Sequence, residues 1–103
     1  MTSVEREFPS DLRAARGHFP GNPIVPGALL LSETLRAIEE SLGARLSPCR
    51  ITFAKFVYPT RPGDRLLIEF SGPVAGVVRF SCAVGGRTVL KGEVKCDAMS
   101  AAK

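Results

Sequence analysis

The single histidine of this chain, His18, is the side chain best suited to acid–base chemistry. Its imidazole has an unperturbed pKa near neutrality, so it can take up and release a proton under physiological conditions. His18 lies in the segment Gly17–Gly27, where three prolines and three glycines in eleven residues exclude a helix or a central strand. We therefore expect a shaped loop that presents a general base.

A second group that could take part in a reaction is the backbone N–H of Gly27. An apolar helical pattern opens at this residue, and the first N–H groups of a helix have no partner within it. The helix dipole adds partial positive charge there, so this N–H can donate a hydrogen bond to an oxygen that becomes negative. Pro20, Pro23 and Pro26 fix φ along the loop and limit its freedom. A base beside an oxyanion donor predicts chemistry next to a carbonyl group.

The helix that positions these groups is predicted from Gly27 to Gly43. Its apolar residues recur at intervals of three and four, which indicates an amphipathic helix with one buried face. These residues are Ala28, Leu30, Leu31, Leu35, Ile38 and Leu42. Gly43 stands where a residue in the left-handed conformation would end the helix.

Strands are predicted on both sides of this helix. An irregular strand is expected within residues 4–16, and alternating strands within 50–58, 66–70, 78–84 and 88–96. We expect a bulge near Ala54–Lys55, a break at Gly72-Pro73 and Gly76, and a tight hairpin at Gly85-Gly86. This order of elements predicts an α+β fold in which an antiparallel sheet curls around one central helix.

Length and hydropathy limit the class of protein. The 103 residues fit one domain over 1–103, with a frayed tail at 99–103. The longest apolar run, Ala28–Leu31, is too short for membrane insertion. The N-terminus lacks the apolar stretch of a secretory signal, so we expect a cytoplasmic protein.

Charge and cysteine spacing exclude further classes. The net charge of +4 comes from basic residues scattered along the chain, whereas a nucleic-acid site would cluster them. Such a surface still suits an acidic protein or a phosphate-bearing ligand, for which Arg45, Arg50, Arg61 and Arg65 are candidates. The three cysteines, Cys49, Cys82 and Cys96, have the spacing of neither a zinc site nor a disulfide framework.

The segment HFPGNPIVPGALLL resembles the H-F-P-G-x-P-x-x-P-G signature of the 3-hydroxyacyl-acyl-carrier-protein dehydratases, which have the hot-dog fold. Ten consecutive positions, His18 to Gly27, match this specific signature. The PTRPGD turn and the strand after it are similar to the family's meander, so the resemblance covers roughly residues 8–96. The short chain looks more like the members found in pigment or aryl-polyene clusters than like housekeeping fatty-acid enzymes.

The resemblance implies a lyase that converts a 3-hydroxyacyl thioester to a trans-2-enoyl thioester in fatty-acid or polyene biosynthesis. His18 would remove the α-proton, and Gly27 N–H would polarise the thioester carbonyl. The substrate would arrive on the phosphopantetheine arm of an acidic acyl carrier protein, with no metal or organic cofactor. Two chains would pair edge to edge as a homodimer, with an acyl tunnel at their interface. The lining residues implied are Phe19, Pro26, Ala28 and Leu31.

In the family, a helix carboxylate fourteen residues after the histidine also assists departure of the 3-hydroxyl. The partner chain supplies this carboxylate. Here that position is Ser32, and Glu33 follows it. One residue turns a helix by about 100°, so Glu33 does not simply inherit the role. An ordinary role for Glu33 is an ion pair with Arg36 at i+3.

Three hypotheses follow from this substitution. Ser32 holds the water or hydroxyl while His18 makes both proton transfers, or a one-residue bulge brings Glu33 into the site. In the third, the carboxylate is absent and the chain is a degenerate hot-dog subunit that binds acyl carrier substrates or partners an active paralogue. A hot-dog thioesterase is a weaker hypothesis, because such enzymes do not normally carry this loop.

Overall fold

The computed structural model describes residues 1–10, 23–46, 48–96 and 100–101. It contains one helix and seven strands among these residues. The elements are β1 (Thr2–Glu7), α1 (Gly27–Leu42), β2 (Ala44–Arg45), β3 (Cys49–Phe56), β4 (Arg65–Val74), β5 (Val77–Val84), β6 (Arg87–Cys96) and β7 (Ser100–Ala101). Five strands form one antiparallel sheet in the order β1-β4-β5-β6-β3.

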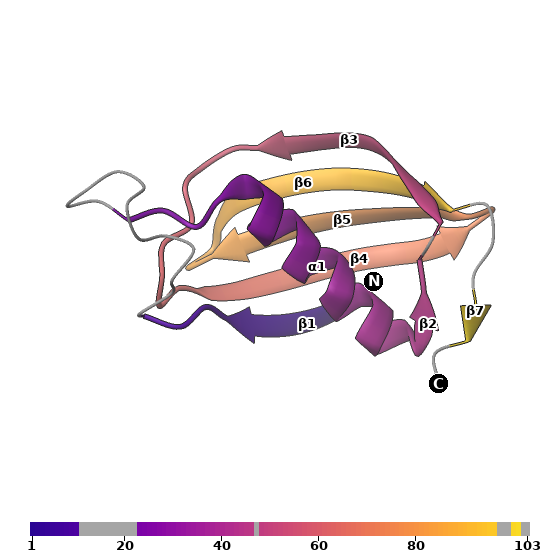
Figure 1. Cartoon of the computed structure of the whole chain (residues 1–103), viewed down its shortest axis with the longest axis horizontal. Coiled ribbons are helices and arrows are strands. Elements are labelled where there is room, and N and C mark those ends of the chain that lie inside the picture. The colour runs from indigo at the N-terminus through magenta and orange to yellow at the C-terminus, as the bar shows by residue number, and fades with distance from the viewer. Residues whose placement is uncertain (11–22, 47, 97–99, 102–103) are drawn as a thin grey trace.

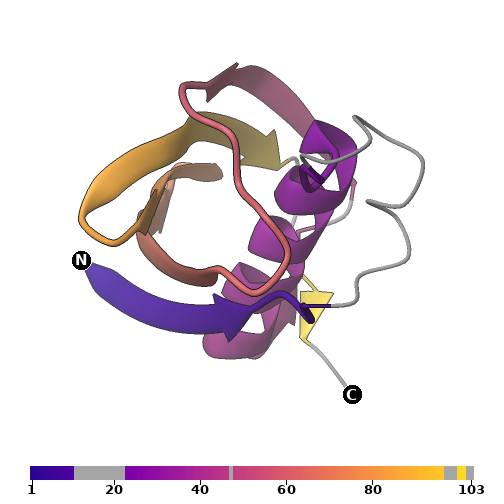
Figure 2. The same cartoon turned by 90° about the vertical axis from the view of Figure 1, so that its left-hand side faces the viewer.

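The sheet curls around α1, which runs across its concave face (Figure 1 and Figure 2). Strands β1 and β3 form the two edges of the sheet. This arrangement confirms the prediction of an antiparallel sheet wrapped around one central helix. The N-terminal end of α1 lies at the same end of the sheet as the connector between β3 and β4 (Figure 1).

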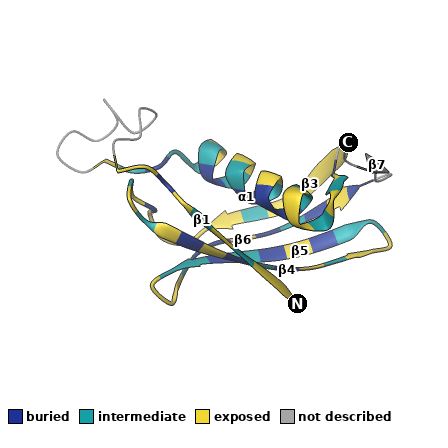
Figure 3. Cartoon of the chain, turned by 90° about the horizontal axis from the view of Figure 1, so that it is seen from below, coloured by how far each residue is buried: buried dark blue, intermediate teal, exposed yellow. Residues whose placement is uncertain are grey.

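The core between helix and sheet follows the predicted alternation of the central strands. From Arg65 to Phe70 in β4 and from Val77 to Cys82 in β5, every second residue is buried, and the residues between them are exposed or partly exposed (Figure 3). The buried side chains in these strands are Leu66, Ile68, Phe70, Val78, Phe80 and Cys82. An antiparallel sheet with one face on a helix and the other toward solvent has this alternation.

The buried face of α1 differs from the predicted stripe. Leu30, Thr34, Ala37 and Ile38 are buried, whereas Ala28 is exposed. Three predicted positions, Leu31, Leu35 and Leu42, are only partly buried. The pattern missed Thr34, whose hydroxyl donates a 2.8 Å hydrogen bond to the Leu30 carbonyl and also lies 3.4 Å from Cys82 Sγ. These contacts let a polar residue occupy the centre of the buried face.

Two predicted strand features were misplaced. The first strand runs over Thr2–Glu7, earlier than the predicted 4–16, and residues 11–22 lie outside the described part of the chain. The bulge in β3 lies between Ile51 and Phe53, not at Ala54–Lys55. Ile51 is therefore opposite the buried Val94, and Phe53 is opposite Glu93 on the other face of the sheet. Bulge position depends on pairing with β6, which the local sequence does not specify.

Turns and chain ends account for the remaining differences. The hairpin at Gly85-Gly86 is confirmed, with positive φ at both residues. The Gly72-Pro73 step does not break β4 but falls within its irregular last residues, and the chain turns after Val74. Within the tail predicted to be frayed, Ser100–Ala101 pairs with β2. In the described part of the chain, no helix has the length and apolar character needed to cross a membrane.

Candidate functional site

The predicted base, His18, and the predicted lining residue Phe19 lie outside the described residues. The described chain resumes at Pro23, four residues before the helix. From there, the backbone N–H of Val25 donates a 2.7 Å hydrogen bond to the carbonyl of Thr60. This bond ties the end of the loop to the connector between β3 and β4. The roles of His18 and Phe19 remain predictions.

The first turn of α1 has an uncompensated positive end. Pro26 occupies the N-cap position with φ −57° and ψ 140°, and no side chain caps the helix. The first turn also contains no acidic residue. Because Gly27 is the first helical residue, its N–H has no partner within the helix. The partial positive charge of the helix N-terminus is therefore available to a bound oxygen.

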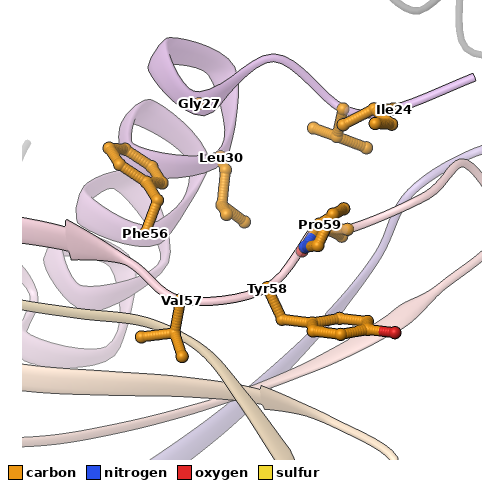
Figure 4. Close-up of a pocket in the computed structure, with 9 residues that line it drawn as sticks. Ile24, Gly27, Leu30, Phe56, Val57, Tyr58 and Pro59 are labelled. Carbon is orange, nitrogen blue, oxygen red and sulfur yellow. The ribbon is translucent and has the colours of Figure 1, made fainter.

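An apolar cavity of about 300 Å³ opens beside Gly27, and we call it the Gly27 hollow. It is lined by Ile24, Val25, Gly27, Leu30, Phe56, Val57, Tyr58, Pro59 and Thr60. The lining thus combines the helix start, the preceding loop and the connector after β3 (Figure 4). Such a cavity suits a ligand with a hydrocarbon body and few polar atoms.

Phe56 is a site residue that the sequence did not indicate. A Cβ placed on Gly27 would lie 3.1 Å from Cε1 and Cζ of Phe56. Glycine therefore lets the Phe56 ring approach the start of the helix, as Figure 4 shows. The half-exposed ring forms one wall of the Gly27 hollow.

Thr60 is a second site residue that the sequence did not indicate. It is 1% exposed, and its hydroxyl has no hydrogen-bond partner in the described structure. A buried polar group without a partner costs folding free energy, so its presence calls for an explanation. No local pattern in the sequence indicated it, because the Val25–Thr60 hydrogen bond joins segments far apart in the chain.

The other predicted lining residues do not reach the Gly27 hollow in a single chain. Pro26 and Leu31 are partly buried, and Ala28 is exposed. None of the three lines this hollow. Ser32, at the position of the family carboxylate, is also exposed. It lies on the side of α1 that faces away from this chain's core, because buried Leu30 and Thr34 flank it at two positions on either side.

Glu33 is held elsewhere. Its carboxylate forms an ion pair with Arg36, 3.7 Å from Oε1 to Nη1, as the i+3 spacing predicted. Glu33 also lines a different cavity of about 220 Å³ with Arg6, Phe8 and Leu29, and this cavity shares no lining residue with the Gly27 hollow. Helix α1 is continuous from Gly27 to Leu42, so the bulge that would re-register Glu33 is not present.

Cys82 is a free thiol that is buried away from the Gly27 hollow. Burial raises the pKa of the Cys82 thiol to about 11, and the contact with the Thr34 hydroxyl partly opposes this shift. A thiol with a raised pKa is a poor nucleophile, so we assign Cys82 to the core. No group of three or more potential metal ligands occurs within the described ranges.

One basic residue, Arg87, contacts the lining of the Gly27 hollow. The guanidinium of Arg87 stacks over the Tyr58 ring, 4.2 Å from its centroid. Among the candidates for carrier contact, Arg45, Arg50 and Arg61 are exposed. Arg65 is exposed too and lies 3.9 Å from Glu7. An exposed pair of this kind contributes little to stability and leaves the cation accessible.

Comparison with known families places most of this chain in one of them. The family model described as ApeI-like, ApeI dehydratase, matches residues 1–93. The 3-hydroxyacyl-[acyl-carrier-protein] dehydratase FabZ of Sodalis glossinidius is 34% identical over 94 residues, covering 81% of this chain and 60% of that protein. The FabZ of Pectobacterium atrosepticum is 36% identical over 95 residues, with the same coverage. This chain thus spans about 60% of the length of these curated relatives.

Solved structures show the same fold. The dehydratase heterocomplex ApeI:P of Xenorhabdus doucetiae matches with a TM-score of 0.73 at 22% identity, covering 95% of this chain and 85% of that chain. The PaaI protein of E. coli, from the phenylacetic acid degradation operon, matches with a TM-score of 0.61 at 18% identity, covering 98% of this chain and 75% of that chain. At these identities the similarity concerns the fold alone, and it confirms the expected hot-dog fold.

Proposed function

This chain belongs to the ApeI-like dehydratase family, and we propose that it removes water from a 3-hydroxyacyl thioester to leave a trans-2-enoyl thioester. The FabZ relatives, named as 3-hydroxyacyl-[acyl-carrier-protein] dehydratases, support this substrate class. We assign the acyl group to an acyl carrier protein in fatty-acid or polyene-type biosynthesis, and the activity to the cytoplasm. The reaction requires no metal or organic cofactor, because a proton transfer and a C–O cleavage suffice.

The proposed chemistry uses the loop and the helix start together. His18 removes a proton from C2 of the acyl chain, and the electron pair moves toward the thioester oxygen. The N–H of Gly27 stabilises the negative charge on that oxygen. The C3–O bond then breaks and the C2–C3 double bond forms. The leaving hydroxide takes up the proton that His18 removed, which gives water and returns His18 to its neutral form. No net oxidation or reduction takes place.

The observation that carries this proposal is the position of Gly27. Its backbone opens a helix that has neither a side-chain cap nor an acidic first turn, and it lines an apolar hollow. A hydrogen-bond donor in an apolar cavity stabilises charge more strongly than one in water. The residues that precede it carry the only histidine of the chain.

Ser32 is our assignment for the helix residue that assists departure of the hydroxyl. Its exposure on the outer side of α1 suits a residue that acts in a site shared with a second chain. Glu33 is the alternative, and its ion pair with Arg36 disfavours it. Turnover by Ser32→Ala and by Glu33→Gln separates the two, because the larger loss identifies the assisting residue.

We further propose that the unit is a homodimer that pairs along β3. Ile51, Phe53 and Phe56 are 46%, 50% and 50% exposed on this edge strand, and an exposed apolar edge is a template for pairing. Pairing there would cover the outer face of α1 and complete an acyl tunnel in which Phe19, Pro26, Ala28 and Leu31 face the chain. The ApeI:P dehydratase of Xenorhabdus doucetiae is a heterocomplex, so a different partner chain is one outcome of the test.

The decisive experiment is turnover of a 3-hydroxyacyl carrier-protein thioester, followed by absorbance of the enoyl product. Wild-type protein is expected to form the enoyl thioester, and His18→Ala to abolish it. Ser32→Asp restores the family carboxylate at an exposed position, so it should fold normally. A large gain from Ser32→Asp, with wild-type protein inactive, would show a degenerate subunit instead of an enzyme.

A further inference from the structure

The hydroxyl of Thr60 is an unexplained polar group at the proposed site. Among the described residues it is the buried side-chain oxygen without a hydrogen-bond partner, although Thr60 is only 1% exposed. The other fully buried threonine, Thr34, is satisfied by the carbonyl of Leu30. Burying a hydroxyl without a partner lowers stability, and valine would fill the same volume without that cost. The free protein therefore gains nothing from this hydroxyl.

A hydrogen bond holds the backbone of Thr60 next to the segment that leads into α1. Its carbonyl accepts the 2.7 Å hydrogen bond from Val25 N–H, which precedes α1 by two residues. Thr60 is therefore held beside the Gly27 hollow, which this residue lines together with Gly27 itself.

The rest of this lining is nearly all hydrocarbon. Ile24, Leu30, Phe56 and Pro59 contribute only apolar side chains. Tyr58 does carry a hydroxyl, but its ring extends away from the helix start (Figure 4) and lies under the Arg87 guanidinium. The described lining residues therefore offer two polar donors, the N–H of Gly27 and the hydroxyl of Thr60, and less than 1 Å² of the Thr60 oxygen is exposed before a ligand binds.

We infer that the Thr60 hydroxyl hydrogen-bonds the 3-hydroxyl group of the bound 3-hydroxyacyl chain and makes the site selective for that group. This inference rests on the proposed function. The acyl part of the substrate has two oxygens, and the thioester oxygen is assigned to Gly27 N–H. The 3-hydroxyl is the oxygen that remains, and a threonine hydroxyl can both donate to it and accept from it.

This assignment has a consequence for product release. Dehydration removes the 3-hydroxyl, so the enoyl chain leaves Thr60 without a partner again. A site with a buried polar group rejects an analogue that lacks the matching group. Thr60 is thus a specificity-determining residue that favours substrate over product, while Gly27 contacts both.

Binding of two non-reactive analogues tests this inference. We would use the 3-hydroxyoctanoyl and octanoyl amides of pantetheine, in which nitrogen replaces the sulfur, so the α-proton is too weakly acidic for elimination. Wild-type protein is expected to bind the hydroxylated amide about three- to tenfold more tightly, the effect of one neutral hydrogen bond. Thr60→Val should bind both amides equally, and Thr60→Ser should keep the preference.

Thr34→Val is the matched control, because it removes a buried hydroxyl that already has partners outside the hollow. It should keep the preference for the hydroxylated amide and melt at a lower temperature than wild type. Thr60→Val should melt at or above the wild-type temperature, and Thr60→Ala serves as a second variant if valine does not fit.

Two binding results would overturn the inference: wild-type protein with no preference for the hydroxylated amide, or a preference that survives in Thr60→Val. A Thr60→Val protein that melts well below wild type would also overturn it, because a bound water would then satisfy the hydroxyl. Failure of the proposed function is a separate result, namely wild-type protein that does not turn over the thioester. The amide measurements do not depend on turnover, so the two failures are distinguishable.

Discussion

Replacing Phe53 by lysine should dissociate the proposed dimer without unfolding the chain. Phe53 is 50% exposed on the edge strand β3, and its neighbour Ile51 is 46% exposed. Lysine on an edge strand blocks pairing with another edge, because its charge would have to leave water. Within one chain the new ammonium lies directly opposite Glu93 of β6, which is a favourable cross-strand pair. The substitution therefore acts on association and leaves the monomer intact.

The expected size of the effect follows from the exposed fraction. Full burial of a phenylalanine side chain contributes about 1.5–3 kcal/mol, so covering the exposed half contributes about 0.8–1.5 kcal/mol. A two-fold interface counts each contact twice, which gives about 1.5–3 kcal/mol for the dimer. The dimer dissociation constant of Phe53→Lys should rise about 10- to 150-fold.

Sedimentation velocity over a series of protomer concentrations measures this constant. The matched control is Leu67→Lys, an exposed apolar residue that also faces a glutamate, Glu5, on the neighbouring strand. Leu67 belongs to β4, which is paired on both sides, so its replacement should leave the dissociation constant unchanged. An unchanged constant in Phe53→Lys, or an equal rise in both variants, would refute the β3 interface.

Three further predictions concern the stability of the chain. Gly92→Ala places a Cβ against the Phe80 ring and should cost about 1–3 kcal/mol, measured as a fall in melting temperature of about 4–8 °C per kcal/mol. Glu39→Ala leaves the buried Leu46 N–H without its 2.7 Å acceptor and should cost about 1–3 kcal/mol in urea unfolding, whereas unchanged stability would mean that water replaces the carboxylate. Because burial raises the Cys82 pKa from 9.0 to about 11, its contribution to stability is complete below pH 9. It should fall by about 2 kcal/mol as the pH rises from 9 to 11, a loss that Cys82→Ala should not show.

The parts of the fold that the sequence predicted are those set by local chemistry. Alternation in β4 and β5 follows from burial of one sheet face, and the Gly85-Gly86 hairpin follows from its positive φ angles. The bulge beside Ile51 was misplaced because it depends on register with β6. Thr34 was overlooked because a hydropathy pattern does not show that its hydroxyl has a partner one turn earlier.

The candidate site also contains residues that the local sequence predicts and residues that it does not. The start of the helix at Gly27 was predictable, because the helix start and the preceding loop are encoded in one short segment. Phe56 and Thr60 were not, because they reach the Gly27 hollow from a connector that is distant in sequence. One hydrogen bond, from Val25 to Thr60, joins these segments.

The mismatch between the predicted and the observed buried face of α1 is itself informative about the assembly. An apolar pattern reports all the surface that a helix hides, whether its own chain or another chain covers it. The core of this chain covers Leu30 and Ile38, while Leu31, Leu35 and Leu42 stay only partly buried on the adjacent flank. In an isolated chain, the exposed part of these three leucines would contribute no burial free energy. A second chain paired along β3 would cover this flank and bring its own loop toward the outer side of α1. On this reasoning, replacing Leu35 by glutamate should weaken the dimer while leaving a folded monomer.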